Sequence, residues 1–396
     1  MTNTTDTVMV PKDPIRPDIS TTAPARLATR LAFFAAGFAM ACCAPLFPFF
    51  KENVAADKAQ FGALLLCLGL GSLIAMPATG MIAARRGARP LILTGGYGLV
   101  VLLPLMALAQ SPMALGAALL VFGAFLGAID VAMNVHGAEV EALEKRPLMS
   151  NFHAHWSIGG FCGAGLMTLL LSLSVPVLAC ACIGAATALI AMLIARPCFL
   201  NVTGKEPEPF VMPRGIVLLL AALTCIIFLV EGAVLDWGAL LIIDRDLSSP
   251  KNAGTGYILF SIAMLIGRLT GDRLIAKAGE FATLVCGGLI AMTGLGVILL
   301  SSNLIVALSG FVLIGLGAAN LVPILFSAAG RQNLMPPGIA IAAVTTTGYA
   351  GLLMGPAIIG FLSDILSLSI AFWLLALLTM IVPLSARWVV SQKNRD

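Results

Sequence analysis

The sequence contains few charged residues. Asp, Glu, Lys and Arg make up 11% of its 396 residues, whereas 59% are hydrophobic and the mean hydropathy is +1.01. Soluble domains carry about a quarter charged residues, because their surfaces face water. Too few charges are present here to cover such a surface, so lipid must surround most of the chain. This excludes soluble enzymes. The net charge of +4 comes from short basic clusters between apolar runs, which excludes a nucleic-acid-binding face.

Several motifs that carry chemistry are also missing. No Cys-x-x-Cys occurs among the nine cysteines, and no His-Glu-x-x-His occurs around His136, His153 or His155. Gly204-Lys205 is followed by Glu206, so no phosphate-binding Walker loop is formed. We therefore expect no metal and no cofactor. The cysteines fall mostly inside apolar runs, as small core residues do: Cys42, Cys43, Cys67, Cys162, Cys180, Cys182, Cys198, Cys225 and Cys286.

What the sequence has instead is long apolar runs, each near the roughly 20 residues that cross a bilayer. They predict an all-α membrane protein with twelve transmembrane helices. The predicted spans are Leu27–Phe50, Phe61–Ala84, Pro90–Ala109, Met113–Asn134, Phe152–Leu173, Val175–Ile194, Gly215–Leu235, Gly254–Arg268, Phe281–Ser301, Ile305–Ala328, Ile339–Leu362 and Ile370–Val390.

Basic residues fix an expected orientation. With the N-terminus inside, nineteen Lys and Arg residues fall on the cytoplasmic side, and only Lys51, Lys58, Arg245 and Lys251 fall on the other. We expect both termini in the cytoplasm of a bacterial inner-membrane protein. The expected organisation is a disordered tail (1–25), a six-helix bundle (26–196), a cytoplasmic linker (197–213), a second six-helix bundle (214–390) and a short tail (391–396).

The two halves repeat one another. Gly279 follows Gly87 by 192 residues (279 − 87), and each glycine closes a short loop of small and basic residues. The same offset relates four further pairs, which predicts two bundles related by a pseudo-twofold axis. These pairs are Gly62 with Gly254, Gly123 with Gly315, Gly159 with Gly351 and Gly163 with Gly355.

Two stretches resemble the major facilitator superfamily. Gly80-Met-Ile-Ala-Ala-Arg-Arg-Gly-Ala-Arg89 resembles its signature between helices two and three, with Ala84 in place of the usual aspartate. Asp130-Val-Ala-Met-Asn134, together with Phe152-His153, resembles the YbjJ/MosC-like branch of sugar- or polyol-type permeases. The resemblance implies a carrier whose helices one, four, seven and ten line a central cavity.

Ionisable groups at membrane depth cost roughly 2.5–3.5 kcal/mol and are functional candidates by default. Asp130 and Asn134 share one face of helix four, and His153 begins helix five. They predict a proton-handling pair, Asp130 with His153; the alternative is a static hydrogen-bond cluster. Glu231, Asp236 and Asn320 fall on the other expected cavity helices. Glu231 is the candidate coupling or substrate carboxylate, unless it is only paired within the bundle.

A second group of residues is expected to act in gating at the cytoplasmic ends of the helices. Arg268 and Asp272 are four residues apart, which predicts a structural latch. The remaining candidates lie in the two repeated loops: Arg85, Arg86, Gly87, Arg89 and Lys277.

Without an ATP-driven motor, transport has to run on a gradient. The expected partners are a small polar solute, protons and the lipid bilayer, and the chain is expected to act as a monomer. Efflux of amphipathic drugs is the alternative within transport. The fifth helix lacks the Gly-Pro typical of drug antiporters in Gly159-Gly-Phe-Cys-Gly163, which counts against it. A non-transporting sensor of the same fold is a further alternative, and an intramembrane enzyme ranks last.

Overall fold

The computed structural model describes residues 22–56, 58–201, 212–248 and 255–391, and within these ranges the chain is helical with no strand. The expected tails and linker lie largely outside the described residues, and the first helix begins at Thr22. The first half contains α1 (Thr22–Asn53), α2 (Lys58–Arg86), α3 (Arg89–Ala107), α4 (Pro112–Glu144), α5 (Met149–Ser172) and α6 (Val177–Ala195), followed by a 3₁₀ turn at Arg196–Cys198. The second half contains α7 (Ile216–Asp244), α8 (Thr255–Leu300), α9 (Leu304–Ala318), α10 (Leu321–Arg331), α11 (Pro337–Ile365), α12 (Leu368–Thr379) and α13 (Ile381–Val390).

The continuous assignment of α8 covers two membrane crossings. Its 46 residues would span about 69 Å at 1.5 Å per residue, more than twice the ~30 Å hydrocarbon layer. The backbone leaves the helix at Gly279 (φ 83°, ψ 161°), where the chain turns back. Together α9 and α10 form one apolar span, as do α12 and α13. The eleven long apolar helices among the described residues therefore make twelve crossings, which confirms the expected fold.

Two helices run past their predicted ends. The run that was expected to stop at Asn134 continues as α4 to Glu144, and the run expected to stop at Arg268 continues to Gly279. A hydropathy pattern ends where charged residues begin, but a helix continues when those side chains find partners inside the bundle. Asp130 and Arg268 therefore lie near the middle of their helices rather than at the ends.

The glycine offset has a structural basis. A Cβ at Gly123 would collide with the backbone carbonyl of Leu68, and a Cβ at Gly315 would collide with that of Phe260, the residue 192 positions after Leu68. Close packing of α4 on α2 in the first half is thus repeated by α9 on α8 in the second. Gly87 and Gly279 also share a positive φ, 78° and 83°. The Gly62–Gly254 pair involves a residue outside the described ranges.

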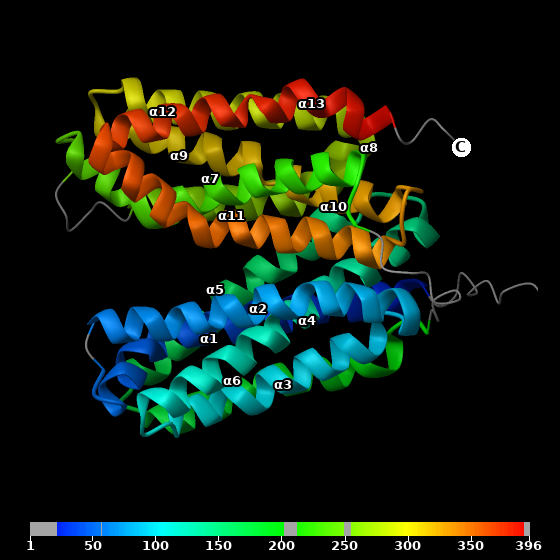
Figure 1. Ribbon diagram of the computed structural model, residues 1–396, viewed down its shortest axis with the longest axis vertical. Coiled ribbons are helices and arrows are strands. Elements are labelled where there is room, and N and C mark those ends of the chain that lie inside the picture. The colour runs from blue at the N-terminus through cyan, green and yellow to red at the C-terminus, as the bar shows by residue number, and fades with distance from the viewer. Residues whose placement is uncertain (1–21, 57, 202–211, 249–254, 392–396) are drawn as a thin grey trace, which may run out of the picture.

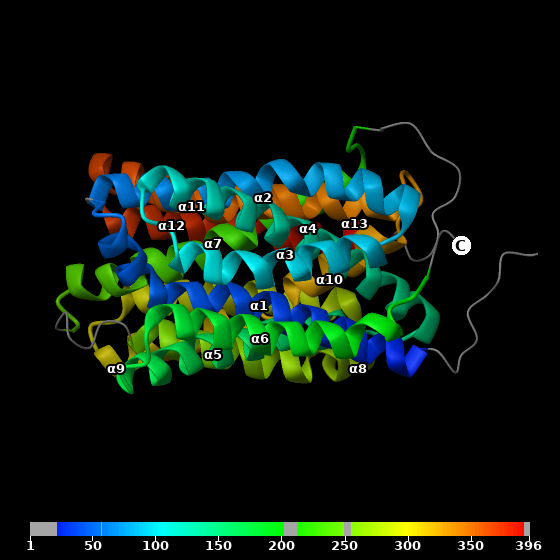
Figure 2. The same ribbon diagram turned by 90° about the horizontal axis from the view of Figure 1, so that it is seen from below.

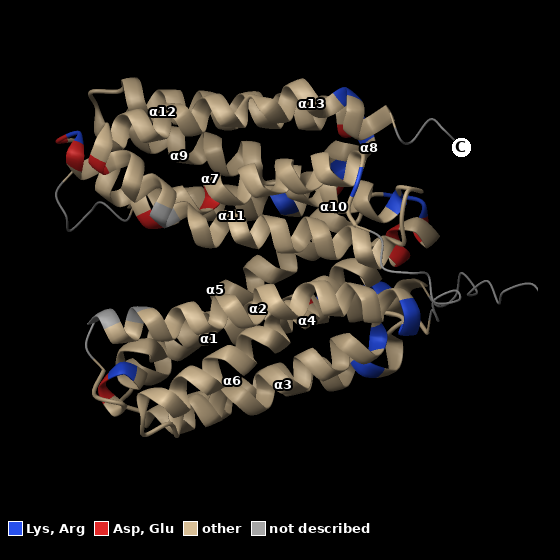
Figure 3. Cartoon of the chain, in the orientation of Figure 1, with Lys and Arg blue, Asp and Glu red and all other residues tan. Residues whose placement is uncertain are grey.

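The helices form two bundles side by side. In Figure 1 the blue-to-green helices α1 to α6 make the lower bundle, and the green-to-red helices α7 to α13 make the upper one. A view turned by 90° shows the helices running roughly parallel along one direction (Figure 2). Lys and Arg concentrate at the end where the chain terminates (Figure 3), and this end is called the basic end below.

Candidate functional site

Both bundles contribute to a cavity of about 160 Å³ between them. α1, α4 and α5 supply side chains from the first half, and α7, α8, α10 and α11 supply them from the second. The lining combines five aromatic rings with four ionisable groups, which is unusual at membrane depth. The lining residues are Phe33, Asp130, Asn134, His153, Trp156, Phe228, Glu231, Arg268, Phe326, Tyr349 and Leu352.

An ion pair joins two of these residues. Arg268 Nη2 lies 3.6 Å from Glu231 Oε1, and Arg268 Nη1 donates a hydrogen bond of 3.0 Å to Ser157 Oγ in the other half. Glu231 Oε1 and Arg268 Nε are buried and have no hydrogen-bond partner. A charge in a low-dielectric interior is stabilised by a close opposite charge, and each residue here is the other's counter-ion. The pair is long and leaves hydrogen-bonding capacity free toward the cavity.

His153 is held between two aromatic rings, one from each half. Its ring centre lies 5.1 Å from that of Phe33 and 5.6 Å from that of Phe326. These contacts fix the imidazole plane, while Nε2 is buried without a hydrogen-bond partner. Asp130 and His153 line the same cavity, but no hydrogen bond between them is found among the described residues. The structure brings the two expected partners together without pairing them.

Asn134 offers the cavity an acceptor. Its Nδ2 donates a 2.8 Å hydrogen bond to the backbone carbonyl of Asp130, one turn earlier on α4. A carbonyl oxygen accepts hydrogen bonds only, so the amide nitrogen must face it and the amide oxygen must point away. That Oδ1 is buried and has no partner.

The two remaining candidates are absent from the cavity lining. Asp236 is exposed on α7, beyond Glu231. Asn320 is buried at the break between α9 and α10, and its Nδ2 donates a 3.1 Å hydrogen bond to the Gly267 carbonyl on α8. Asn320 thus ties together two helices of the same half.

Sequence reasoning missed most of the aromatic lining. Phe33, Trp156, Phe228 and Tyr349 face the cavity, and the Phe228 and Tyr349 rings meet edge to face at 5.8 Å. An aromatic residue in an apolar run has the same pattern whether it packs in the core or lines a cavity, so the sequence carries no signal that separates the two. Tyr349 is the partial exception, because a polar hydroxyl inside a span needs an explanation.

The halves are also tied together at the basic end. Glu141 Oε2 accepts hydrogen bonds from the backbone nitrogens of Leu148 (2.8 Å) and Met149 (3.1 Å), which caps the start of α5. Arg331 of the second half reaches Glu141 at 3.5 Å and Glu280 at 2.8 Å. One arginine thereby bridges an acid of each half.

A second tie involves Asp272. Its Oδ1 accepts a 3.3 Å hydrogen bond from the backbone nitrogen of Asn151, so a carboxylate of the second half lies at the N-terminus of α5 in the first. Nearby, the backbones of Gly80 on α2 and Gly338 on α11 meet, and a Cβ on either would collide with the other chain segment. The expected Arg268–Asp272 latch does not form among the described residues, because Arg268 points into the cavity instead.

The other gating candidates lie at the protein surface or in turns. Arg85, Arg86 and Lys277 are exposed. Gly87 takes a left-handed conformation in the turn after α2, and Arg89 donates a hydrogen bond to Asn201 Oδ1 just after α6. None of these four makes a contact between the halves that the structure resolves among its described residues.

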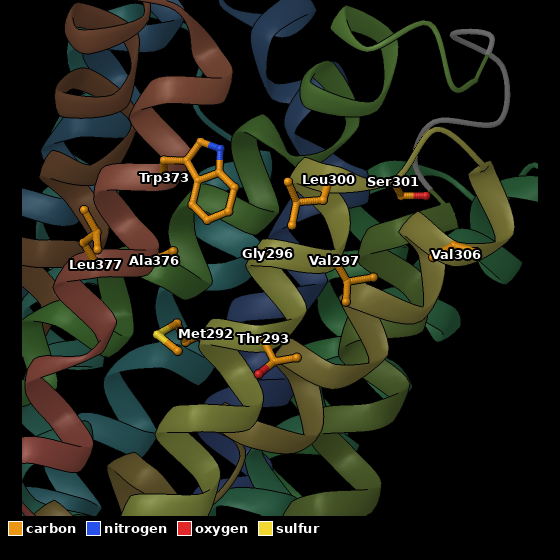
Figure 4. A pocket seen from close by; sticks show the side chains of 10 residues that line it. All are labelled: Met292, Thr293, Gly296, Val297, Leu300, Ser301, Val306, Trp373, Ala376 and Leu377. Atoms are coloured by element: carbon orange, nitrogen blue, oxygen red, sulfur yellow. The ribbon is translucent and has the colours of Figure 1, made fainter.

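The largest hollow of the described molecule lies elsewhere. It is a groove of about 480 Å³ on the outer face of the second bundle, where Trp373 of α12 points toward Gly296 of α8 (Figure 4). No ionisable residue lines it, and Leu300 and Leu377 are 75% and 66% exposed. Such a surface suits contact with lipid chains, so the smaller polar cavity is the candidate site.

Comparisons with known proteins place this geometry in a wider group. The sequence model described as Major Facilitator Superfamily matches residues 30–333. An uncharacterized MFS-type transporter of Yersinia pestis is 44% identical over 366 residues, covering 92% of this chain and 95% of that protein. The membrane protein MosC of Rhizobium meliloti is 28% identical over 88% of this chain and 86% of its own. Among solved structures, the E. coli fucose:proton symporter FucP superimposes with a TM-score of 0.75 at 18% identity, over 93% of this chain and 99% of that one.

Proposed function

Because this chain belongs to the Major Facilitator Superfamily, we propose that its central cavity carries a small polar solute, such as a sugar or polyol, and couples that movement to protons. Members of this family are multi-pass membrane transporters rather than enzymes. Alternating access would expose the cavity between the halves to one side of the membrane and then to the other.

Cavity size supports a small solute. About 160 Å³ equals the volume of roughly five water molecules at ~30 Å³ each, well below the ~300–1,000 Å³ of pockets for drug-sized ligands. This favours a solute of one sugar ring over amphipathic drugs. Aromatic faces beside unpaired polar atoms also suit a ring that has an apolar face and a rim of hydroxyls. FucP, which shares the fold, is a fucose:proton symporter.

Coupling is assigned to Glu231, with Asp130 and His153 as further proton carriers. Glu231 is the counter-ion of Arg268, and Arg268 also bonds to Ser157 across the two halves. Protonation of Glu231 would remove the attraction that holds Arg268, so the contact between the halves would change with the proton. This is the observation that carries the proposal: one arginine joins a titratable acid to the opposite half.

Gating is assigned to the basic end. Arg331 with Glu141, and Asp272 with the start of α5, hold the halves together there and would have to separate when the cavity opens to that side. We place this end in the cytoplasm of the inner membrane, together with both termini, because it carries most of the lysines and arginines. The repeated halves enclose a complete cavity in one chain, which supports a monomer.

Counterflow in proteoliposomes tests the proposal. Vesicles loaded with D-glucose, D-fucose or myo-inositol would take up the same labelled compound when they contain the protein, and empty vesicles would not. We expect Glu231→Gln and Asp130→Asn to reduce proton-driven uptake at least about tenfold, as loss of a coupling group does. Asp236→Asn is the matched control, since it neutralises an exposed acid on the same helix as Glu231. Equal uptake in all variants would remove the cavity acids from the mechanism.

A further inference from the structure

The cavity lining contains more negative than positive charge. Asp130 and Glu231 are acids, whereas Arg268 is the one permanent cation among the residues that line it. Arg268 is already paired with Glu231. Asp130 is buried on the opposite half, and no ion pair involving it is found among the described residues.

Acceptors also outnumber donors among the unpartnered atoms. Asn134 Oδ1 is fixed as an acceptor by its hydrogen bond to the Asp130 carbonyl, and Glu231 Oε1 is a second free acceptor. Arg268 Nε is the free donor, and His153 Nε2 serves as either. A buried acceptor left unpaired costs free energy, so the solute that suits this lining brings several N–H or O–H donors.

Aromatic rings surround the same space. Phe33, Trp156, Phe228 and Tyr349 line the cavity together with Asp130, and Tyr349 is within electrostatic reach of both acids. The face of an aromatic ring attracts a cation, and several rings beside a carboxylate form the usual surroundings of a bound ammonium group.

We propose that the transported solute carries a protonated amine as well as hydroxyls, as an amino sugar or an amino polyol does, with the ammonium beside Asp130 and the Asn134 amide oxygen. The inference rests on the function proposed above and narrows its substrate class. Asp130 then holds two cations in turn, the ammonium of the solute and a proton. A sugar acid is disfavoured, because its carboxylate would add a third negative charge.

Four hexoses of closely related shape separate these possibilities. Glucose, glucosamine, N-acetylglucosamine and glucuronate differ in one substituent that is neutral, cationic, a neutral amide or anionic. Binding to the purified full chain is measured at neutral pH by calorimetry. We expect glucosamine to bind at least about tenfold more tightly than glucose or N-acetylglucosamine, and glucuronate to bind most weakly.

Variants assign the preference to Asp130. Asp130→Asn should reduce the affinity for glucosamine to that for glucose, and Asp130→Glu should keep the preference if the charge is what matters. Asp236→Asn should leave all four affinities unchanged. Equal affinities for glucose and glucosamine in the wild type, or tightest binding of glucuronate, would overturn the amine assignment and leave the sugar transporter standing. Binding of none of the four would overturn both.

Discussion

Arg268 Nη2 and Glu231 Oε1 lie 3.6 Å apart at the centre of the membrane-spanning bundle, with the arginine also bonded to Ser157 of the other half. The two side chains are 9% and 19% exposed. An ion pair this far from water holds its place because each charge would be costly without the other. Its stability is therefore set by the pair as a unit, and its function by what happens when the pair is neutralised.

Removing one partner should destabilise the protein more than removing both. Arg268→Gln alone leaves Glu231 as an uncompensated buried charge, which costs about 3–5 kcal/mol when a buried pair is broken. The double variant Arg268→Gln/Glu231→Gln should recover most of that loss, since no unpaired charge remains. Melting temperatures of the purified variants in detergent measure the coupling. Simple additivity of the two single losses would show that the pair contributes nothing as a unit.

Two adjacent glycines on α5 should respond very differently to alanine. A Cβ at Gly159 would meet the Phe34 carbonyl oxygen on α1, whereas a Cβ at Gly160 has no atom within 4 Å. Gly159→Ala should thus lower the melting temperature by several degrees, because α1 and α5 must move apart. Gly160→Ala should leave it unchanged or raise it slightly, since alanine favours a helix by up to ~1 kcal/mol over glycine. Equal effects at both positions would contradict the packing described for α1 and α5.

The ties at the basic end should control how far the halves separate there. Arg331→Gln combined with Asp272→Ala removes the bridge to Glu141 and the carboxylate at the start of α5. Spin labels at the exposed positions Arg85 and Lys277, in a chain whose native cysteines are replaced, should show a longer and broader distance distribution. Arg273→Gln is the control, because that side chain is exposed beside Asp272. An unchanged distribution in the double variant would rule these contacts out as a gate.

Orientation is testable without any knowledge of the solute. With the basic end in the cytoplasm, a reporter fused after Ser391 that works only in the cytoplasm should be active, and one that needs export should be silent. Fusions in the turn between α3 and α4 should show the opposite pattern. Activity of the exported reporter at the C-terminus would reverse the assignment of the gate to the cytoplasmic side.

The fold could be predicted from the sequence because its signals are local and repeated. Apolar runs of membrane length, basic loops and the 192-residue offset between Gly87 and Gly279 all act over short stretches or at a fixed spacing. The positive φ shared by these two glycines shows that the offset marks equivalent turns.

The site could be predicted only in part, because its contacts join residues far apart in sequence. Asp130, Asn134, His153 and Glu231 were candidates through their polarity at membrane depth, and the structure places all four at one cavity. Arg268 was expected beside Asp272, four residues away, whereas its partner lies on another helix. Helical spacing indicates which residues share a face, but which helix that face meets depends on how the bundle packs.

Proton movement that accompanies solute entry tests the central claim most directly. Proteoliposomes that contain a trapped pH-sensitive dye would receive an external sugar that binds, glucose or glucosamine, in the absence of any preset gradient. We predict a change in internal pH that depends on the sugar, is present in the wild type and in Asp236→Asn, and is lost in Glu231→Gln. Solute entry with no pH change in the wild type, or an undiminished change in Glu231→Gln, would contradict coupling through the Glu231–Arg268 pair.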